Sequence, residues 1–235
     1  MKKIAFKHYV REEIISGIIL QVNQQAHILP SCIFIHGGGS ASYKERIIDF
    51  TEPIFKENIN ILSFDFSGHG ESTGTLATGS LERRVIEAQE IIKHYSALQA
   101  LTIFGASMGG YIAIKLLELF PINTLILFCP ALYDVKAYEI PFDKGFTEII
   151  RSFESWRNTD VLKILEKFTG KLLIIMGSED QVIPEGVIEL IMKHATRVNK
   201  KELYIIPQCS HQIHTWLESH PEDLKRLHQK ITEYL

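Results

Sequence analysis

The sequence predicts an α/β fold built on a mostly parallel sheet with helices on both faces. Short runs of Ile, Leu and Phe alternate along the chain with segments of helical periodicity, an order that is typical of βαβ crossovers. Several runs are continuously apolar, as expected for strands that are covered on both faces. Since 235 residues can bury one large core, we predict a single domain over residues 1–235.

Eight segments have the length and composition of strands. They are residues 3–10, 14–22, 31–35, 60–65, 101–104, 124–129, 171–176 and 202–206. The first two are joined by polar residues and predict an N-terminal hairpin, in which Gly17 would mark a β-bulge. The sheet is therefore expected to have eight strands.

Helical spacing predicts the segments that connect these strands. The expected helices are residues 43–57, 78–96, 108–120, 187–196 and 221–235. Ser80 is placed to cap the second helix, Pro121 ends the third, and Pro221 lies near the first position of the last.

Residues 131–168 interrupt the alternation of strands and helices. The segment is too long for one crossover helix and is rich in aromatic residues. We predict a small inserted cap, because the segment leaves the sheet near the strand ends, where ligands bind in open α/β sheets. The alternative is an extra pair of helices that packs on the domain without a role at the site.

Composition and charge argue against several classes of protein. The net charge is −3 and the basic residues are scattered, so neither nucleic acid nor an anionic membrane is an expected partner. No apolar stretch approaches the length of a membrane-spanning helix, and charged residues interrupt any signal-peptide core near the N-terminus. Cys32, Cys129 and Cys209 have no CxxC spacing and are expected to be buried free thiols in a reducing, cytoplasmic environment.

Ser107 occupies the centre of a Gly-x-Ser-x-Gly turn between an apolar run and an amphipathic segment. A serine on a tight strand-to-helix turn presents its hydroxyl outward, as a nucleophile requires. Gly105 and Gly109 are expected to avoid clashes where strand and helix cross at the turn. The alternative is a turn of small residues without chemistry.

A serine hydroxyl needs a base, and the base needs an orienting acid. Asp180 follows the strand at 171–176, and His211 follows the strand at 202–206. Both would lie with Ser107 at the same edge of a parallel sheet, and the chain order Ser, Asp, His is that of the α/β-hydrolase architecture.

The whole set of motifs resembles the α/β-hydrolase superfamily over nearly the whole chain. It looks like the branch of small bacterial serine esterases, the cinnamoyl and feruloyl esterases and monoacylglycerol-lipase-like enzymes with a short cap. The motifs are His36-Gly37-Gly38, Asp65-x-x-Gly68-x-Gly70-x-Ser72, Gly105-x-Ser107-x-Gly109, Gly177-x-x-Asp180-x-x-x-Pro184 and Ser210-His211. The Gly37-Gly38-Gly39 run is closer to the lipase form of that loop.

The resemblance implies a serine hydrolase that cleaves carboxylic esters of small to medium acyl or aryl-acyl groups through an acyl-enzyme intermediate. Ser107 would be the nucleophile, His211 the general base and Asp180 the residue that orients it. The backbone N–H groups of Gly38 and Met108 would form the oxyanion hole. A small-molecule ester is the expected partner, no cofactor or metal is expected, and the protein would be a monomer or homodimer.

Substrate contacts are expected at five further positions. They are His36, Gly39, Tyr133, Tyr138 and Phe142. His36 would mainly hold the oxyanion loop by hydrogen bonding, and Gly39 is the fallback for Gly38 in the oxyanion hole. The cap aromatics would line an acyl or aryl pocket, or would only pack the cap onto the core.

Several side chains near these motifs have alternative interpretations. Glu179 could replace Asp180 as the acid, although the family pattern and the shorter side chain favour Asp180. His211 and His214 could be a metal pair, but no third ligand with zinc-site spacing is evident. Asp65 is expected to pin its loop, and Cys209 lacks the geometry of a nucleophile.

Other functions share these motifs. A thioesterase, an amidase or a peptidase would use the same triad, because pocket shape decides the leaving group. A non-catalytic binding protein on the same fold would be expected to lose triad members or oxyanion glycines. Dehalogenases and epoxide hydrolases have an aspartate at the position of Ser107, so the serine argues against both.

Overall fold

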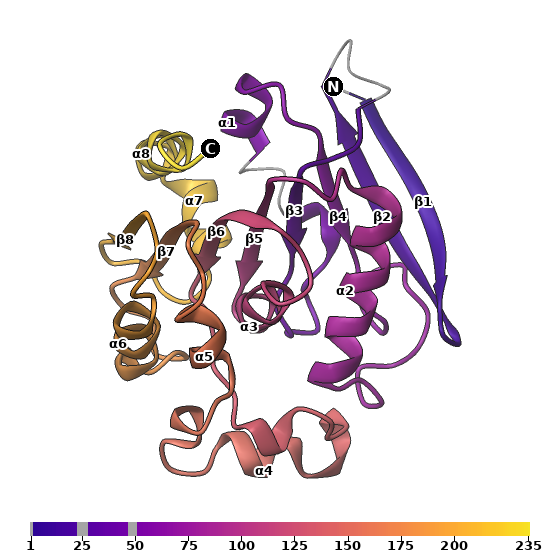
Figure 1. Cartoon of the computed structure of the whole chain (residues 1–235), viewed down its shortest axis with the longest axis vertical. Helices are drawn as coiled ribbons and strands as arrows, with labels where there is room; N and C mark the ends of the chain where they lie inside the picture. The colour runs from indigo at the N-terminus through magenta and orange to yellow at the C-terminus, as the bar shows by residue number, and fades with distance from the viewer. Residues whose placement is uncertain (1, 23–27, 47–50) are drawn as a thin grey trace.

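A computed structural model describes residues 2–22, 28–46 and 51–235 and contains one eight-stranded sheet (Figure 1). The strand order is β1-β2-β4-β3-β5-β6-β7-β8, and every pairing from β4 to β8 is parallel. The strands are β1 Lys2–Val10, β2 Glu13–Gln21, β3 Cys32–Ile35, β4 Ile61–Phe64, β5 Leu101–Ala106, β6 Ile122–Phe128, β7 Lys171–Gly177 and β8 Lys200–Ile206. The predicted fold class is confirmed.

The N-terminal hairpin is present, but Gly17 is not at a bulge. β1 and β2 pair antiparallel in an unbroken register in which Phe6 faces Gly17. A Cβ atom at Gly17 would overlap the Phe6 ring, which stacks on Tyr95 with centroids 3.9 Å apart. The bulge prediction was therefore wrong, because this glycine makes room for an aromatic ring and not for a kink.

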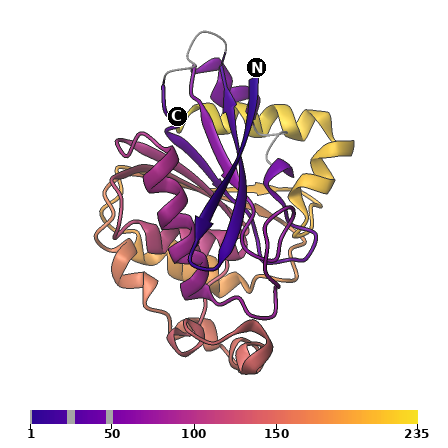
Figure 2. The same ribbon diagram turned by 90° about the vertical axis from the view of Figure 1, so that its right-hand side faces the viewer.

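Helices cover both faces of the sheet, and α2 and α8 lie on opposite sides of it (Figure 2). α2 packs against α3, α3 against α5, and α5 against α6, whereas α1 and α7 pack against α8. The helices are α1 Thr51–Lys56, α2 Leu81–Tyr95, α3 Met108–Leu116, α4 Thr147–Ile150, α5 Val161–Leu165, α6 Glu185–His194, α7 Ile213–Ser219 and α8 Pro221–Thr232. The Ser80 hydroxyl accepts the Arg83 N–H at 3.1 Å, which confirms the predicted cap.

Two expected helices are shortened or interrupted, and one helix was not expected. Of the helix expected over residues 43–57, the structure shows a 3₁₀ turn at 44–46 and α1, and residues 47–50 lie outside the described residues. The third helix is regular only to Leu116 and ends in turns before Pro121. The helix α7 was not expected, because its seven residues are shorter than a periodic pattern needs to be recognised.

The part of the segment between β6 and β7 that contains α4 lies beyond the C-terminal ends of the parallel strands, at the lower edge in Figure 1, whereas α5 packs against α3 and α6. The whole segment contains short turns, η2 Val135–Ala137, η3 Phe142–Phe146 and η4 Ser155–Arg157, besides α4 and α5. Backbone bonds tie it to the loop after β4: Phe142 N–H donates to Gly79 O at 2.8 Å, and Asp143 N–H to Ala77 O at 3.1 Å. The segment thus borders the strand ends at which the proposed site residues lie.

Two further expectations concerned the cysteines and membrane-spanning segments. Cys32, Cys129 and Cys209 are buried and free, as predicted. Within the described residues, no helix has both the length and the apolar character that crossing a bilayer requires.

Candidate active site

Ser107 lies on a strained turn between β5 and α3. Its backbone has φ 52° and ψ −114°, a conformation that is unfavourable for a residue with a side chain. The turn is held from both sides, because Ser107 N–H donates to Phe128 O at 2.8 Å and Ser107 O accepts the Ala131 N–H at 3.1 Å. This arrangement presents the hydroxyl at the C-terminal edge of the sheet.

Gly105 and Gly109 are required by close backbone contacts. A Cβ atom at Gly105 would come within 2.6 Å of Gly109 O, so the strand and α3 could not cross as closely as they do. A Cβ atom at Gly109 would overlap the carbonyl groups of Ile35 and His36 at the end of β3. The two glycines thus let β5 and β3 approach the start of α3.

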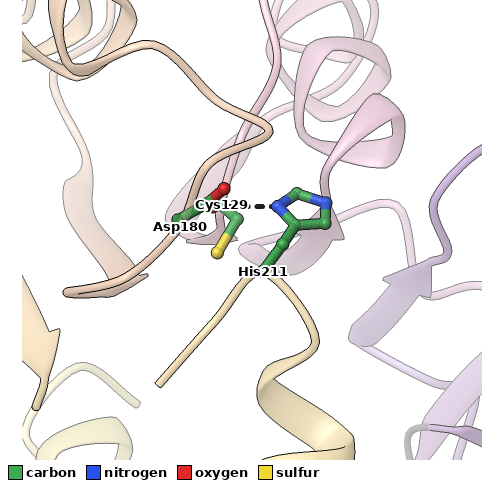
Figure 3. A group of neighbouring side chains, drawn as sticks. All are labelled: Cys129, Asp180 and His211. Atoms are coloured by element: carbon green, nitrogen blue, oxygen red, sulfur yellow. Dashed lines mark hydrogen bonds and ion pairs between the residues drawn. The ribbon is translucent and has the colours of Figure 1, made fainter. Parts of the chain in front are cut away.

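Asp180 and His211 form a hydrogen-bonded pair in the loops after β7 and β8. His211 Nδ1 lies 2.8 Å from Asp180 Oδ2, and the Asp180 side chain is almost fully buried (Figure 3). A Cβ atom at Gly177 would overlap the backbone of Cys209 and Ser210, so this glycine lets the loop that carries His211 approach β7.

The surroundings of Asp180 stabilise its ionised form. Burial alone would raise the pKa of Asp180, but hydrogen bonds from His211, Cys129, Ile183 and Val182 outweigh it and lower the pKa to about 2. The two backbone N–H groups reach Oδ1 at 2.8 Å from Val182 and 3.1 Å from Ile183. The carboxylate is therefore negative at neutral pH and can orient the imidazole.

The structure bears on two alternatives, Glu179 as the acid and His211 with His214 as a metal pair. Glu179 is exposed, and it is Asp180 that contacts His211. In the described part of the chain, one group of three potential metal ligands has its donor atoms within 4.8 Å: Cys129, Asp180 and His211. His214 is not in that group, although it lines the same cavity as His211.

Ser107 and His211 line the same cavity, which has a volume of about 440 Å³ and which we call the His211 cavity. No hydrogen bond joins the two side chains among the described residues. Such bonds are often long in unliganded enzymes and shorten when substrate binds. The shared cavity leaves the approach between hydroxyl and imidazole open.

Two backbone N–H groups near Ser107, those of Gly38 and Met108, have no protein acceptor among the hydrogen bonds of the described residues. Met108 is the first residue of α3, where a backbone N–H has no intrahelical partner and the helix dipole favours negative charge. A Cβ atom at Gly38 would lie 3.0 Å from Met108 Sδ, so the two residues are in close contact.

His36 holds the loop that carries Gly38. Its Nε2 accepts the Phe66 N–H at 3.0 Å, so Nδ1 carries the proton and donates to Gly37 O at 2.7 Å. Burial, followed by the nearby His69, lowers the pKa of His36 to about 3 although the bond to Gly37 raises it. The ring is thus neutral and has a structural role in the loop.

Asp65 fixes the neighbouring loops through charge and backbone contacts. Its buried carboxylate accepts the Lys44 N–H at 2.6 Å and the Glu71 N–H at 3.1 Å. The Lys44 ammonium lies 2.7 Å from Asp65 and 2.8 Å from Glu71. Among the described residues, neither ring nitrogen of the buried His69 has a hydrogen-bond partner in good geometry. Burial, followed by the charge of Arg84, lowers the pKa of His69, and the nearby backbone groups of Gly38 and Ser67 oppose this shift.

A second cavity lies between Ser107 and the segment 131–168, with a volume of about 460 Å³. We call it the cap-side cavity. Its lining includes Gly38, Gly39, Leu76, Ala77, Ser107, Met108, Tyr133, Phe142, Asp143, Phe146 and Thr147. His211 lines only the first cavity, whereas Ser107 lines both.

The five expected substrate contacts are distributed unevenly between the cavities. His36 lines the His211 cavity, Tyr133 and Phe142 line the cap-side cavity, and Gly39 lines both. Tyr138 lines neither cavity; the Lys115 ammonium lies 4.8 Å from the centre of its ring. Burial, followed by the negative charge of Glu82, raises the pKa of Tyr138 to about 12.

Three residues at the site were not singled out from the sequence, although Phe146 belongs to the cap aromatics that were expected either to line a pocket or to pack the cap. Cys129 contacts Asp180, and its position at the end of the strand expected at 124–129 could have placed it there. Phe146 joins Phe142 in an edge-to-face pair with centroids 4.8 Å apart. Arg46 lines the His211 cavity, and nothing in the local sequence pattern indicates that position.

The comparisons with known proteins agree with this architecture. The family model described as serine aminopeptidase, S33, matches residues 27–159, more than half of the chain. That range contains Gly38 and Ser107, whereas Asp180 and His211 lie beyond it. A search of curated proteins gave no match.

Solved structures share the fold at low sequence identity. Est1E from Butyrivibrio proteoclasticus, solved with ferulic acid bound, has a TM-score of 0.70 and 19% identity, and the alignment covers 96% of this chain and 98% of that one. The esterase EaEST from Exiguobacterium antarcticum has a TM-score of 0.65 and 18% identity, with 94% and 96% covered. A predicted CIB-like hydrolase from Thermoplasma acidophilum has a TM-score of 0.68 and 18% identity, with 99% of each chain covered.

Proposed function

The chain belongs to the family of α/β-hydrolases described as serine aminopeptidase, S33, and on this basis we propose that it is a serine hydrolase that cleaves carboxylic esters of small to medium acyl or aryl-acyl groups. The observation that carries the proposal is the 2.8 Å hydrogen bond between Asp180 and His211, because His211 lines the same cavity as Ser107. Ionised acid, imidazole and strained serine are the parts that acyl transfer requires.

The reaction begins with attack of Ser107 Oγ on the ester carbonyl carbon while His211 Nε2 takes the hydroxyl proton. The tetrahedral oxyanion receives hydrogen bonds from Gly38 N–H and Met108 N–H, which have no protein acceptor among the described residues. The carbon–oxygen bond to the alcohol then breaks, and His211 gives its proton to the departing oxygen. Water attacks the acyl-serine by the same path and releases the acid.

The cap-side cavity supports an apolar acyl group. Tyr133, Phe142 and Phe146 line it beside Ser107, and Tyr133 lies edge to face with Tyr111, with centroids 5.3 Å apart. A cavity of about 460 Å³ is within the usual range for small ligands. These features favour a short acyl or aryl-acyl chain over a long one.

The test is hydrolysis of p-nitrophenyl acetate by the wild type and by Ser107→Ala, together with labelling by a fluorophosphonate probe. We expect the wild type to turn over and to be labelled, and the variant to show background rates and no label. Turnover by a folded Ser107→Ala variant would refute the assignment of the nucleophile. Absence of both turnover and labelling in the wild type would favour a binding protein on this fold.

A second candidate, cleavage of an aminoacyl amide, is favoured by one observation besides the name of the family model. The exposed Asp143 lines the cap-side cavity and could receive an ammonium group. Aminoacyl p-nitroanilides and p-nitrophenyl esters of the same acyl group discriminate the two candidates. Ester hydrolysis predicts the larger kcat/KM for the plain p-nitrophenyl esters and no loss with Asp143→Asn.

A further inference from the structure

Arg46, which carries a positive charge, is one of the residues that line the His211 cavity. The side chain is half-buried, and its guanidinium carbon lies 5.4 Å from the centre of the Tyr43 ring. No carboxylate lies within ion-pair distance of this guanidinium in the part of the chain that the structure describes. Glu45, its neighbour in sequence, pairs with Lys3 at 2.8 Å and with Lys44 at 3.7 Å.

The rest of the cavity lining, as far as the structure describes it, offers no acidic partner to the Arg46 guanidinium and is largely apolar. Among the described residues that line the cavity there is no aspartate or glutamate. Phe34, Phe104 and Phe128 contribute aromatic surface, with the first two stacked at 4.2 Å between centroids. A guanidinium beside apolar walls is suited to bind a planar carboxylate through paired hydrogen bonds.

The position of His211 indicates which part of the substrate enters this cavity. The departing oxygen must come within reach of the imidazole that protonates it, and His211 lines only this cavity. The alcohol part therefore occupies the His211 cavity, and the acyl part occupies the cap-side cavity.

We propose that the substrate is an ester whose alcohol part carries a carboxylate, and that Arg46 binds this carboxylate while Ser107 attacks the ester carbon. This inference rests on the proposed function and adds a substrate class to it. Arg46 is then a residue that selects substrate by charge, at a distance from the reacting bond.

The experiment compares hydrolysis of the acetyl ester in two compounds whose alcohol parts differ in charge, 4-acetoxybenzoate and its methyl ester. We expect the wild type to prefer the anionic ester. Arg46→Gln should lower kcat/KM for the anionic ester about tenfold, as for loss of one charge-assisted hydrogen-bonded pair, and should leave the methyl ester within about twofold. Arg46→Lys keeps the charge but not the paired donors, and should restore part of the preference.

A second pair of esters tests the orientation. Mono-4-nitrophenyl glutarate carries its carboxylate on the acyl side, and 4-nitrophenyl valerate is its neutral counterpart. Arg46→Gln should change both rates alike. A selective loss on the glutarate ester would overturn the placement of the alcohol in the His211 cavity.

Binding separates this inference from the proposed function. Calorimetric titration of Ser107→Ala with 4-hydroxybenzoate should show binding that Arg46→Gln weakens about tenfold, and binding of methyl 4-hydroxybenzoate should not respond. If p-nitrophenyl acetate is hydrolysed through Ser107 but Arg46→Gln affects charged and neutral compounds equally, the anion site is wrong and the proposed function stands. If no ester is hydrolysed but the selective weakening is seen, the anion site stands and the proposed function is wrong.

Discussion

His36 Nε2 accepts the backbone N–H of Phe66 at 3.0 Å, and this bond determines the protonation state of a buried histidine under the Gly37–Gly39 loop. The other ring nitrogen must then carry the single proton, which it donates to Gly37 O at 2.7 Å. Adding a second proton would break the bond to Phe66 and bury a charge. Burial, followed by the charge of His69, accordingly lowers the pKa of His36 to about 3.

This pKa makes the stability of the protein depend on pH. An unfolded histidine takes up a proton near pH 6.5, whereas folded His36 resists it until about pH 3. Because the unfolded state binds more protons in that window, the stabilisation is complete above pH 6.5 and is lost as pH falls, by at most about 1.4 kcal/mol per pH unit from this group. We expect urea unfolding at pH 7, 6 and 5 to show this decline.

His36→Gln provides the matched variant. Because glutamine cannot take up the proton, the free energy of unfolding of His36→Gln should vary less between pH 7 and pH 5 than that of the wild type. Burial also lowers the pKa of His69. His69 therefore adds to the pH dependence of the free energy of unfolding with the same sign, in the wild type and in His36→Gln alike. Equal slopes in wild type and His36→Gln would contradict the assignment.

Asp180→Asn tests the orienting role of the carboxylate. An asparagine side chain can donate to His211 Nδ1, which would hold the proton on the wrong nitrogen, so Nε2 could not accept the proton of Ser107. We expect kcat for a p-nitrophenyl ester to fall by about 10³ to 10⁴ with the fold retained. Circular dichroism would check the fold of the variant.

Glu179→Gln is the control for that experiment, because Glu179 precedes Asp180 but is exposed. Its rate should stay within about threefold of wild type, as for a surface substitution away from the reacting groups. A larger loss with Glu179→Gln than with Asp180→Asn would reverse the choice of acid.

The sequence was sufficient for the fold because its signals are local and repeated. Apolar runs separated by helical segments predicted all eight strands within a few residues, and the parallel topology placed Ser107, Asp180 and His211 at one edge. The family pattern and the shorter side chain favoured Asp180 over Glu179, and in the structure it is Asp180 that contacts His211.

Other features depended on contacts that no local pattern records. Gly17 looked like a bulge because a glycine in a strand is usually explained by the backbone, but here it accommodates the Phe6 ring across the hairpin. Arg46 enters the His211 cavity from a loop that is remote in sequence from His211 itself. Tyr138, expected at the substrate, lies against Lys115 instead, because an aromatic residue in the segment 131–168 has more than one surface to contact.

Alanine substitutions at Gly38 and at Gly39 can distinguish which of the two residues donates its backbone N–H to the oxyanion. Neither has a positive φ, so alanine is compatible with the backbone at both positions. At Gly38 the new methyl group would lie 3.0 Å from Met108 Sδ and 3.3 Å from Met108 Cε, which forces the side chain or the loop to move. At Gly39 the nearest atom, Ser42 Oγ, is 3.7 Å away, an ordinary contact.

We therefore expect Gly38→Ala to lower kcat by about tenfold or more by displacing one oxyanion donor, with KM little changed, and Gly39→Ala to remain near wild type. The double variant Gly38→Ala with Met108→Ala removes the sulfur that the methyl group meets while keeping the Met108 backbone N–H. The fall in kcat from Met108→Ala to the double variant should therefore be smaller than the fall from wild type to Gly38→Ala. A greater loss of kcat with Gly39→Ala than with Gly38→Ala, with KM unchanged, would instead assign the oxyanion donor to Gly39.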